Sequence, residues 1–143
     1  MPNSAEEFDQ ALNGEATWEA ALGIPAGVLE VYAVLGSQYY EQGLVADAKA
    51  MFNAVITLNH RSHLGYAGLG ALELRDGNLD AALQYLEQAY ARDPTDLVVC
   101  GNLGEVLVLL GRRQEAARHL KESAALDPSE TNSYANRDRK SVV

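Results

Sequence analysis

Pairs of leucine and glycine recur along this chain at a fixed spacing of 34 residues, and this spacing constrains the fold more than any other feature. The pairs begin at Leu35, Leu69 and Leu103. The same step relates two further sets of small residues, Gly43, Gly77 and Gly111, and Ala48, Ala82 and Ala116. Asp-Pro closes the second and third segments, at 93–94 and 127–128. A chain that repeats in this way is built from one supersecondary unit stacked on copies of itself.

The period and its anchors are those of the tetratricopeptide repeat, in which each unit of 34 residues is a helix–turn–helix. The sequence therefore predicts an all-α fold, a right-handed superhelical stack of three tetratricopeptide repeats with an N-terminal helical cap. We place the cap in residues 1–28, the repeats in residues 29–62, 63–96 and 97–130, and a polar tail in residues 131–143.

The glycines of the repeats have two predicted roles. In the first repeat, helices are expected over Val28–Gln42 and Val45–Leu58, so Gly43 falls just past a helix end, where a left-handed residue costs least as glycine. Gly70 and its two counterparts fall inside a helix, where glycine costs about 1 kcal/mol relative to alanine. That cost indicates that another backbone passes close. On this interpretation Gly70→Val would overpack the contact, whereas Gly70→Ala could be tolerated.

Some positions depart from the repeat pattern. Asn59-His60 replaces Asp-Pro at the end of the first repeat, which predicts a weaker helix terminator than Pro94 provides. Glu73 stands at an otherwise apolar position, so we expect it in solvent at the edge of its helix. His119 is also expected to face solvent. The polar tail is expected to form either one short helix around Tyr134 or a frayed end.

The N-terminal cap is expected to be helical, with one apolar face. Ser4 and Glu7 fit a capping box, and Asn13-Gly14 interrupts the helix that follows. The cap carries more apolar surface than a thin cover on three repeats requires. We therefore predict a modest homodimer through residues 4–24, with contacts at Phe8, Leu12, Trp18 and Leu22.

Composition narrows the class of partner. The 143 residues carry a formal net charge of −9, which opposes binding to nucleic acid or to an anionic membrane. No apolar run reaches the roughly 18–20 residues of a membrane-spanning helix, and the first residues lack the basic and apolar regions of a secretory signal. The single cysteine, Cys100, suits a reducing compartment. These features predict a cytoplasmic protein.

In a tetratricopeptide stack, the first helix of each repeat lines a concave groove with its positions 2, 5, 9 and 12. Here the residues are mostly small or apolar, which predicts a groove for an extended, largely apolar peptide; self-association and a plain scaffold are the alternatives. None of the nine groove positions below holds Lys or Asn. Repeats that grip heat-shock chaperones need these residues there, to pair with a terminal carboxylate. The predicted partner-binding residues are Ala33, Ser37, Tyr40, Ala67, Ala71, Leu74, Gly101, Glu105 and Val108.

Few residues have the spacing of a chemical site. His60 and His63 form a His-x-x-His pair, but no carboxylate or cysteine stands beside them at ligand spacing, so we expect turn histidines, no metal and no cofactor. Cys100 is expected to be buried rather than reactive. Glu105 lies in the predicted groove, either solvated at its rim or bonded to a peptide amide or base. Because no Ser-His-Asp or Cys-His arrangement is discernible, we expect that the chain is not an enzyme.

Part of the sequence is more specific than a generic repeat. The stretch carries the motifs Gly23-Ile-Pro, Leu29-Glu-Val-Tyr-Ala, Tyr39-Tyr40, Ala48 through Phe52, Leu58-Asn59-His60 and Gly68-Leu-Gly-Ala71. Over about residues 14–75 it resembles the class II chaperones of bacterial type III secretion, which hold hydrophobic translocator proteins. Asn59 stands where that family usually has Asp, and residues 76–130 match only the general repeat.

The resemblance implies a bacterial cytoplasmic chaperone that binds a short extended segment of a translocator in its concave groove. It also implies dimerisation through the N-terminal helical region, as family members often show. The main alternative is a generic tetratricopeptide adaptor or regulatory scaffold that joins folded proteins. A chaperone would make an otherwise insoluble apolar client soluble, whereas an adaptor would bind a partner that is already soluble.

Overall fold

The computed structural model describes residues 5–126, which form eight α-helices and, within that range, no strand. The chain divides within α5, between Gly68 and Leu69, into two compact units. The all-α prediction is confirmed. The helices are α1 (Ala5–Leu12), α2 (Trp18–Ala21), α3 (Val28–Glu41), α4 (Val45–Leu58), α5 (Leu64–Arg75), α6 (Leu79–Arg92), α7 (Leu97–Leu109) and α8 (Arg113–Leu126).

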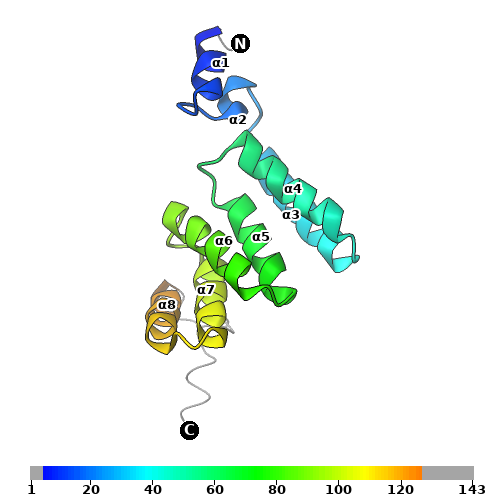
Figure 1. The fold of residues 1–143 in the computed structure, drawn as a ribbon. Coiled ribbons are helices and arrows are strands. Elements are labelled where there is room, and N and C mark those ends of the chain that lie inside the picture. The colour runs from blue at the N-terminus through cyan, green and yellow to red at the C-terminus, as the bar shows by residue number, and fades with distance from the viewer. Residues whose placement is uncertain (1–4, 127–143) are drawn as a thin grey trace. The chain divides into compact units, whose positions relative to one another are not determined.

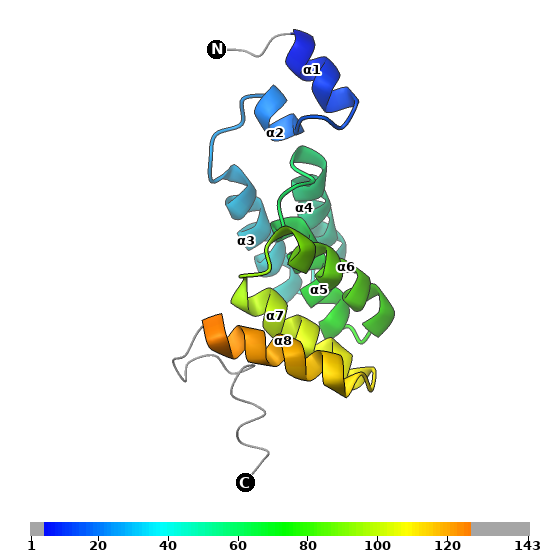
Figure 2. The ribbon, with the colours of Figure 1, turned by 90° about the vertical axis from the view of Figure 1, so that its left-hand side faces the viewer.

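Paired helices are joined by short glycine turns. In the first unit α3 and α4 lie side by side (Figure 1), and in the second unit α7 and α8 do the same (Figure 2). The two helices predicted for the first repeat are confirmed, with α3 ending at Glu41 instead of Gln42. The turn glycines are left-handed as predicted, with φ of 80°, 82° and 79° at Gly43, Gly77 and Gly111.

The glycines inside the first helix of each pair make room for a large side chain of the second helix. A β-carbon added at Gly70 would lie 2.7 Å from Cγ of Leu86, well inside the 3.5–4.0 Å at which carbon atoms pack best. The predicted close approach is confirmed, but the neighbour is chiefly a side chain and not, as expected, another backbone. The three pairs are Gly36 with Phe52, Gly70 with Leu86 and Gly104 with Leu120.

Phe52 is enclosed on two sides within the first unit. Its ring faces Gly36 on α3 and Gly68 on α5, where an added β-carbon would overlap the ring. At Gly65, one turn earlier on α5, a β-carbon would lie 2.7 Å from the carbonyl oxygen of Phe52. Phe52 is 3% exposed. Three glycines therefore make space for one aromatic residue and its backbone.

Asn59 ends α4 in nearly the same backbone conformation with which Asp93 ends α6, and the weaker terminator stays a prediction. The angles are φ −148° and ψ 92° at Asn59, and φ −143° and ψ 91° at Asp93. Oδ1 of Asn59 accepts a hydrogen bond from the backbone N–H of Arg61 at 3.0 Å, as Oδ1 of Asp93 does from Thr95 at 2.9 Å. An amide oxygen thus replaces the carboxylate in this turn, without a proline.

The N-terminal helices α1 and α2 pack on each other and are tied to the end of α4. Thr17 caps α2, with its hydroxyl accepting a backbone N–H of that helix at 3.2 Å. The side-chain amide of Asn59 donates to Oε2 of Glu19 at 2.7 Å, and the guanidinium of Arg61 donates to the carbonyl oxygen of Glu15 at 2.7 Å. These bonds hold the N-terminal segment within the first unit.

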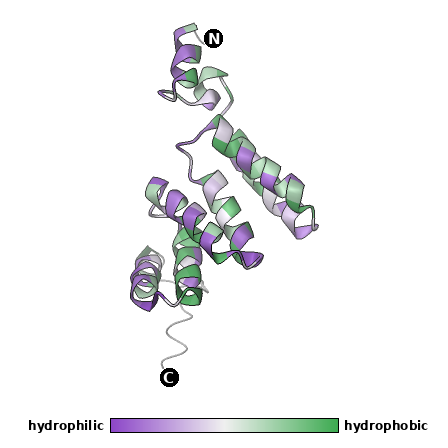
Figure 3. Cartoon of the chain, in the orientation of Figure 1, coloured by the Kyte–Doolittle hydropathy of each residue, from purple (hydrophilic) through white to green (hydrophobic). Residues whose placement is uncertain are grey.

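The second unit has its own apolar core. α7 is hydrophobic over most of its length, whereas α8 is largely hydrophilic (Figure 3). Glu73 is 7% exposed, so its predicted place in solvent is wrong. Asn78 donates to Oε2 of Glu73 at 2.6 Å, which offsets part of the cost of burying the carboxylate. The core residues are Ala82, Leu86, Leu103, Val106, Leu107 and Ala116.

Two predictions concern residues outside the described range. The capping box needs Ser4, and the tail helix is predicted around Tyr134, so both lie outside residues 5–126.

Within residues 5–126, every helix is too short or too polar to cross a membrane. The alanines at the 34-residue step are buried, with Ala48 and Ala82 0% exposed and Ala116 1% exposed.

The contact at Gly70 gives a stability prediction that revises the expectation from the sequence. Leu86 is 0% exposed and its backbone nitrogen would lie 3.2 Å from the added β-carbon, so it cannot move aside. We expect Gly70→Ala to lower the free energy of unfolding by about 1–2 kcal/mol, because overpacking outweighs the gain in helix propensity. Urea unfolding measures the change.

A double-mutant cycle provides the control. In a Leu86→Ala background the same Gly70→Ala change fills part of a cavity, so its cost should be smaller or reversed. Equal stability of wild type and Gly70→Ala, or an equal cost in both backgrounds, would contradict the proposed contact between these two residues.

Candidate functional site

The predicted groove residues of the first unit lie on α3 and at the start of α5. Ala33, Ser37 and Tyr40 are separated by four and three positions and therefore share one face of α3. Ser37 is exposed, whereas Ala33, Tyr40 and Ala67 are half-buried. The hydroxyl of Ser37 donates to the carbonyl oxygen of Ala33 at 3.2 Å. This face of α3 thus presents small side chains and one aromatic ring with part of their surface open.

The predicted groove residues of the second unit lie on α5 and α7. Gly101, Glu105 and Val108 share a face of α7, again at steps of four and three. Gly101 is buried and Glu105 half-buried, while Val108 is 49% exposed. On α5, Ala71 and Leu74 are both half-buried. Of these three residues of α7, Val108 therefore has the most exposed side chain.

Several exposed apolar residues near these positions were missed by the sequence reasoning. Val31 and Val34 on α3 are each 56% exposed, and Val98 and Leu109 on α7 are 58% and 57% exposed. In the sequence they follow the same apolar pattern as their buried neighbours, so no local signal separates them. They enlarge the apolar surface that each unit offers to a partner.

The residues predicted for dimerisation form a partly exposed apolar cluster. Leu12 is 70% exposed, Leu22 51% and Phe8 39%, whereas Trp18 is half-buried. The rings of Phe8 and Trp18 meet edge to face, with centroids 6.2 Å apart and planes at 66°. We call the four side chains the N-terminal apolar cluster.

Cys100 is fully buried on α7, as predicted. It is 0% exposed, and its Sγ donates to the carbonyl oxygen of Pro94 at 3.4 Å. Burial, aided by the negative charges of Glu122, Asp96 and Asp93, raises the pKa of the Cys100 thiol to about 11. Only the thiolate is nucleophilic, so this side chain acts as a small apolar residue.

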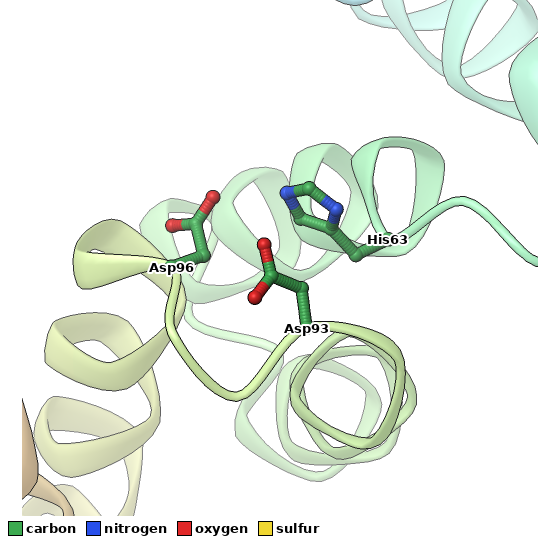
Figure 4. Close-up of side chains that lie close together, drawn as sticks. All are labelled: His63, Asp93 and Asp96. Atoms are coloured by element: carbon green, nitrogen blue, oxygen red, sulfur yellow. The ribbon is translucent and has the colours of Figure 1, made fainter.

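The acidic residues of the α6–α7 loop have structural partners. Figure 4 shows Asp93 and Asp96, which flank Pro94 and Thr95 in this loop. Asp93 accepts from both the backbone N–H and the hydroxyl of Thr95, at 2.9 and 2.6 Å. Asp96 caps α7, accepting the backbone N–H of Val99 at 3.0 Å. Both carboxylates therefore stabilise the loop and the start of α7.

The three histidines have different surroundings. His60 and His63 lie between α4 and α5, where helix–helix turn residues were predicted. His119, by contrast, is 6% exposed, so its predicted place in solvent is wrong. It packs against Tyr90, whose ring centroid is 4.8 Å away. His119 is the 23rd residue of the third predicted repeat, and nothing in the neighbouring sequence indicated that it is buried.

A family model matches the second half of the chain. Residues 73–136 match the tetratricopeptide repeat model, and the paired helices and left-handed glycine turns described above are consistent with this match. The chain has the tetratricopeptide-repeat fold.

Solved structures resemble most of the chain. The type III secretion translocator chaperone SycD of Yersinia enterocolitica is 25% identical, with a TM-score of 0.67 over 83% of this chain and 90% of SycD. A type III secretion complex from Aeromonas hydrophila has a TM-score of 0.73 at 21% identity, covering 94% and 91% of the two chains. The Arabidopsis OM64 tetratricopeptide domain has a TM-score of 0.67 at 22% identity, covering 80% and 96%.

The resemblance to translocator chaperones found in the sequence is thus confirmed by the likeness to SycD. SycD has also been solved with a peptide of the translocator YopD; that structure is 24% identical to this chain, with a TM-score of 0.67 over 83% of this chain and 91% of SycD. The same fold is found in a tetratricopeptide domain of Arabidopsis, that of OM64.

The environment of Cys100 gives a prediction for the reactivity of its thiol. At pH 7.5, a thiol with a pKa of about 11 is ionised to less than about a hundredth of the extent of an ordinary cysteine with a pKa of about 8.5. We expect Cys100 to react with a thiol-specific disulfide reagent more than about a hundredfold more slowly in the folded chain than in denaturant. Similar rates in the two conditions would show that the thiol is accessible.

Proposed function

We propose that this protein is a chaperone for a hydrophobic translocator of a type III secretion system and that it acts in the bacterial cytoplasm. The observation that carries the proposal is the likeness to SycD, a translocator chaperone, over most of both chains. The complex of SycD with a YopD peptide supports an extended translocator segment as the ligand. The sequence motifs between residues 14 and 75 support the same conclusion independently.

In this proposal, the client segment lies along the first helix of each repeat. The small side chains of Ala33, Ala67 and Ala71 leave space for client side chains, and Val108 supplies exposed apolar surface. An extended apolar segment loses contact with water when it binds there, at roughly 25 cal/mol per Å² of buried apolar area. Covering such a segment prevents its aggregation before secretion.

We further propose that two copies associate through the N-terminal apolar cluster. The support is its exposed apolar surface at Phe8, Leu12 and Leu22. The segment is also fixed to the first unit by the bonds from Asn59 and Arg61, so association would lose little further conformational entropy in that segment.

An adaptor that joins folded proteins is the second candidate function, and the match of residues 73–136 to the general tetratricopeptide repeat model favours it. We propose a binding role, and not catalysis, in either case. The buried Cys100 and the hydrogen-bonded Asp93 and Asp96 support this view because each has a structural role.

A charge in the proposed groove should abolish client binding. We expect Ala67→Glu to weaken the binding of a co-expressed translocator by more than a hundredfold, because burying a carboxylate against apolar side chains costs several kcal/mol. Ala46→Glu, at an exposed alanine of α4 outside the predicted groove, is the matched control and should bind normally. Circular dichroism establishes that both variants are folded. Undiminished binding by a folded Ala67→Glu variant would exclude this face.

Association through the N-terminal apolar cluster is tested by substitution instead of deletion, because deletion would also remove Glu15 and Glu19 and their bonds to the first unit. Leu12→Glu, at a side chain 70% exposed, should give a monomer that still binds the client. Leu44→Glu, on another exposed leucine, should leave the dimer intact. Light scattering over a concentration series distinguishes the two, and a wild-type chain that stays monomeric at about 100 μM would refute the dimer.

A further inference from the structure

His119 lies in the second unit with a buried ring nitrogen. The residue is 6% exposed, and among residues 5–126 no group makes a hydrogen bond with its Nδ1. The ring of Tyr90 on α6 stands edge-on to the imidazole, with the planes at 83°. Glu122, almost one turn further along α8, places its Oε2 3.4 Å from Nδ1.

The same carboxylate oxygen links α6 to α8. The hydroxyl of Tyr90 donates a hydrogen bond to Oε2 of Glu122 at 2.7 Å. Hydrogen bonds to a charged acceptor are about twice as strong as those between neutral groups. Oε2 of Glu122 thus bonds to Tyr90 on α6 and also lies beside His119, which is on α8 together with Glu122.

The other titratable groups around His119 do not offer it an equivalent acceptor. Arg118 on α8 is positive and disfavours a charged imidazole. Glu115 is paired with Arg112, with 2.7 Å between their nearest charged atoms. Cys100 on α7 interacts electrostatically with Glu122 and Tyr90, and its thiol stays protonated. Glu122 is therefore the group to which a protonated ring would bond.

We propose that His119 and Tyr90 compete for the carboxylate of Glu122, so that acid draws this carboxylate toward His119 and weakens the link between α6 and α8. A neutral imidazole carries one ring proton, whereas a charged one carries a proton on both nitrogens. A buried N–H without an acceptor is costly, and Oε2 of Glu122 is within reach at 3.4 Å. A contact within α8 is then strengthened at the expense of a bond between two helices.

The direction of the pH effect follows from the burial of the ring. Burial lowers the pKa of His119, although Glu122 acts in the opposite direction. The folded chain therefore binds fewer protons than the unfolded chain near the ordinary histidine pKa of about 6.5. The stability that comes from keeping His119 buried and neutral is complete above about pH 6.5. It is lost as the pH falls through the lowered pKa of His119.

Hydrogen exchange of the full chain at pH 7.5 and 5.5, corrected for the intrinsic rates, tests the proposal. We expect the wild-type amides of α8 to lose about tenfold in protection at pH 5.5, as for the loss of one hydrogen bond of ordinary net strength. His119→Gln cannot be protonated and should keep its protection. His60→Gln, in the first unit, is the matched control and should lose protection as wild type does.

Tyr90→Phe distinguishes competition for Glu122 from a simple penalty for a buried charge. Without the hydroxyl, protection of α8 should already be low at pH 7.5 and change little in acid. Wild-type protection of Tyr90→Phe at pH 7.5, or an acid effect in His119→Gln as large as in wild type, would overturn the proposal.

Glu122→Gln provides a second test if His119→Gln does not fold. The amide oxygen can still accept from Tyr90 but carries no charge to attract an imidazolium, so the tenfold acid effect should largely disappear. An undiminished acid effect in this variant would also contradict the proposal.

Discussion

Each helix pair depends on a contact in which a large apolar side chain of the second helix lies over a glycine of the first. Any β-carbon at Gly36, Gly70 or Gly104 would overlap this side chain. The glycine lowers helix propensity by about 1 kcal/mol, but it allows Phe52 and Leu86 to be buried almost completely. Burying one such side chain contributes roughly 1.5–3 kcal/mol. This gain is larger than the loss of helix propensity at the glycine, so the folded helix pair is favoured.

The predicted groove residues lie beside this contact on the same helix, three positions before the glycine and one and four positions after it. Ala33 and Ala67 there keep part of their surface open. α7 shows the same division, with buried Leu103 and exposed Val108 on one helix. The packing of the repeat and its proposed binding surface therefore follow from one arrangement of small and large residues.

The sequence was a good guide to features that depend on local backbone chemistry. The spacing of Gly43, Gly77 and Gly111 predicted the left-handed turns, which the structure confirms. It was a poor guide where a partner that the repeat pattern does not specify decides the outcome. Glu73 is buried because Asn78 bonds to it, and His119 is buried against Tyr90. Neither partner is recognisable from the repeat pattern.

Part of the candidate site could likewise be predicted from the sequence, and part could not. The 34-residue period placed the predicted groove residues on the first helix of each repeat, on α3, α5 and α7. It did not identify the exposed Val31 and Val34, because exposure on a helix of alternating small and apolar residues depends on which neighbours cover it.

Purification of the protein from its native host, with identification of the co-purifying protein by mass spectrometry, tests the central claim most directly. The co-purifying protein is then expressed with and without this chain. The account predicts a partner with long apolar segments that is insoluble when expressed alone and soluble when this chain is co-expressed. A partner that is folded and soluble without this chain would contradict the chaperone function and favour an adaptor.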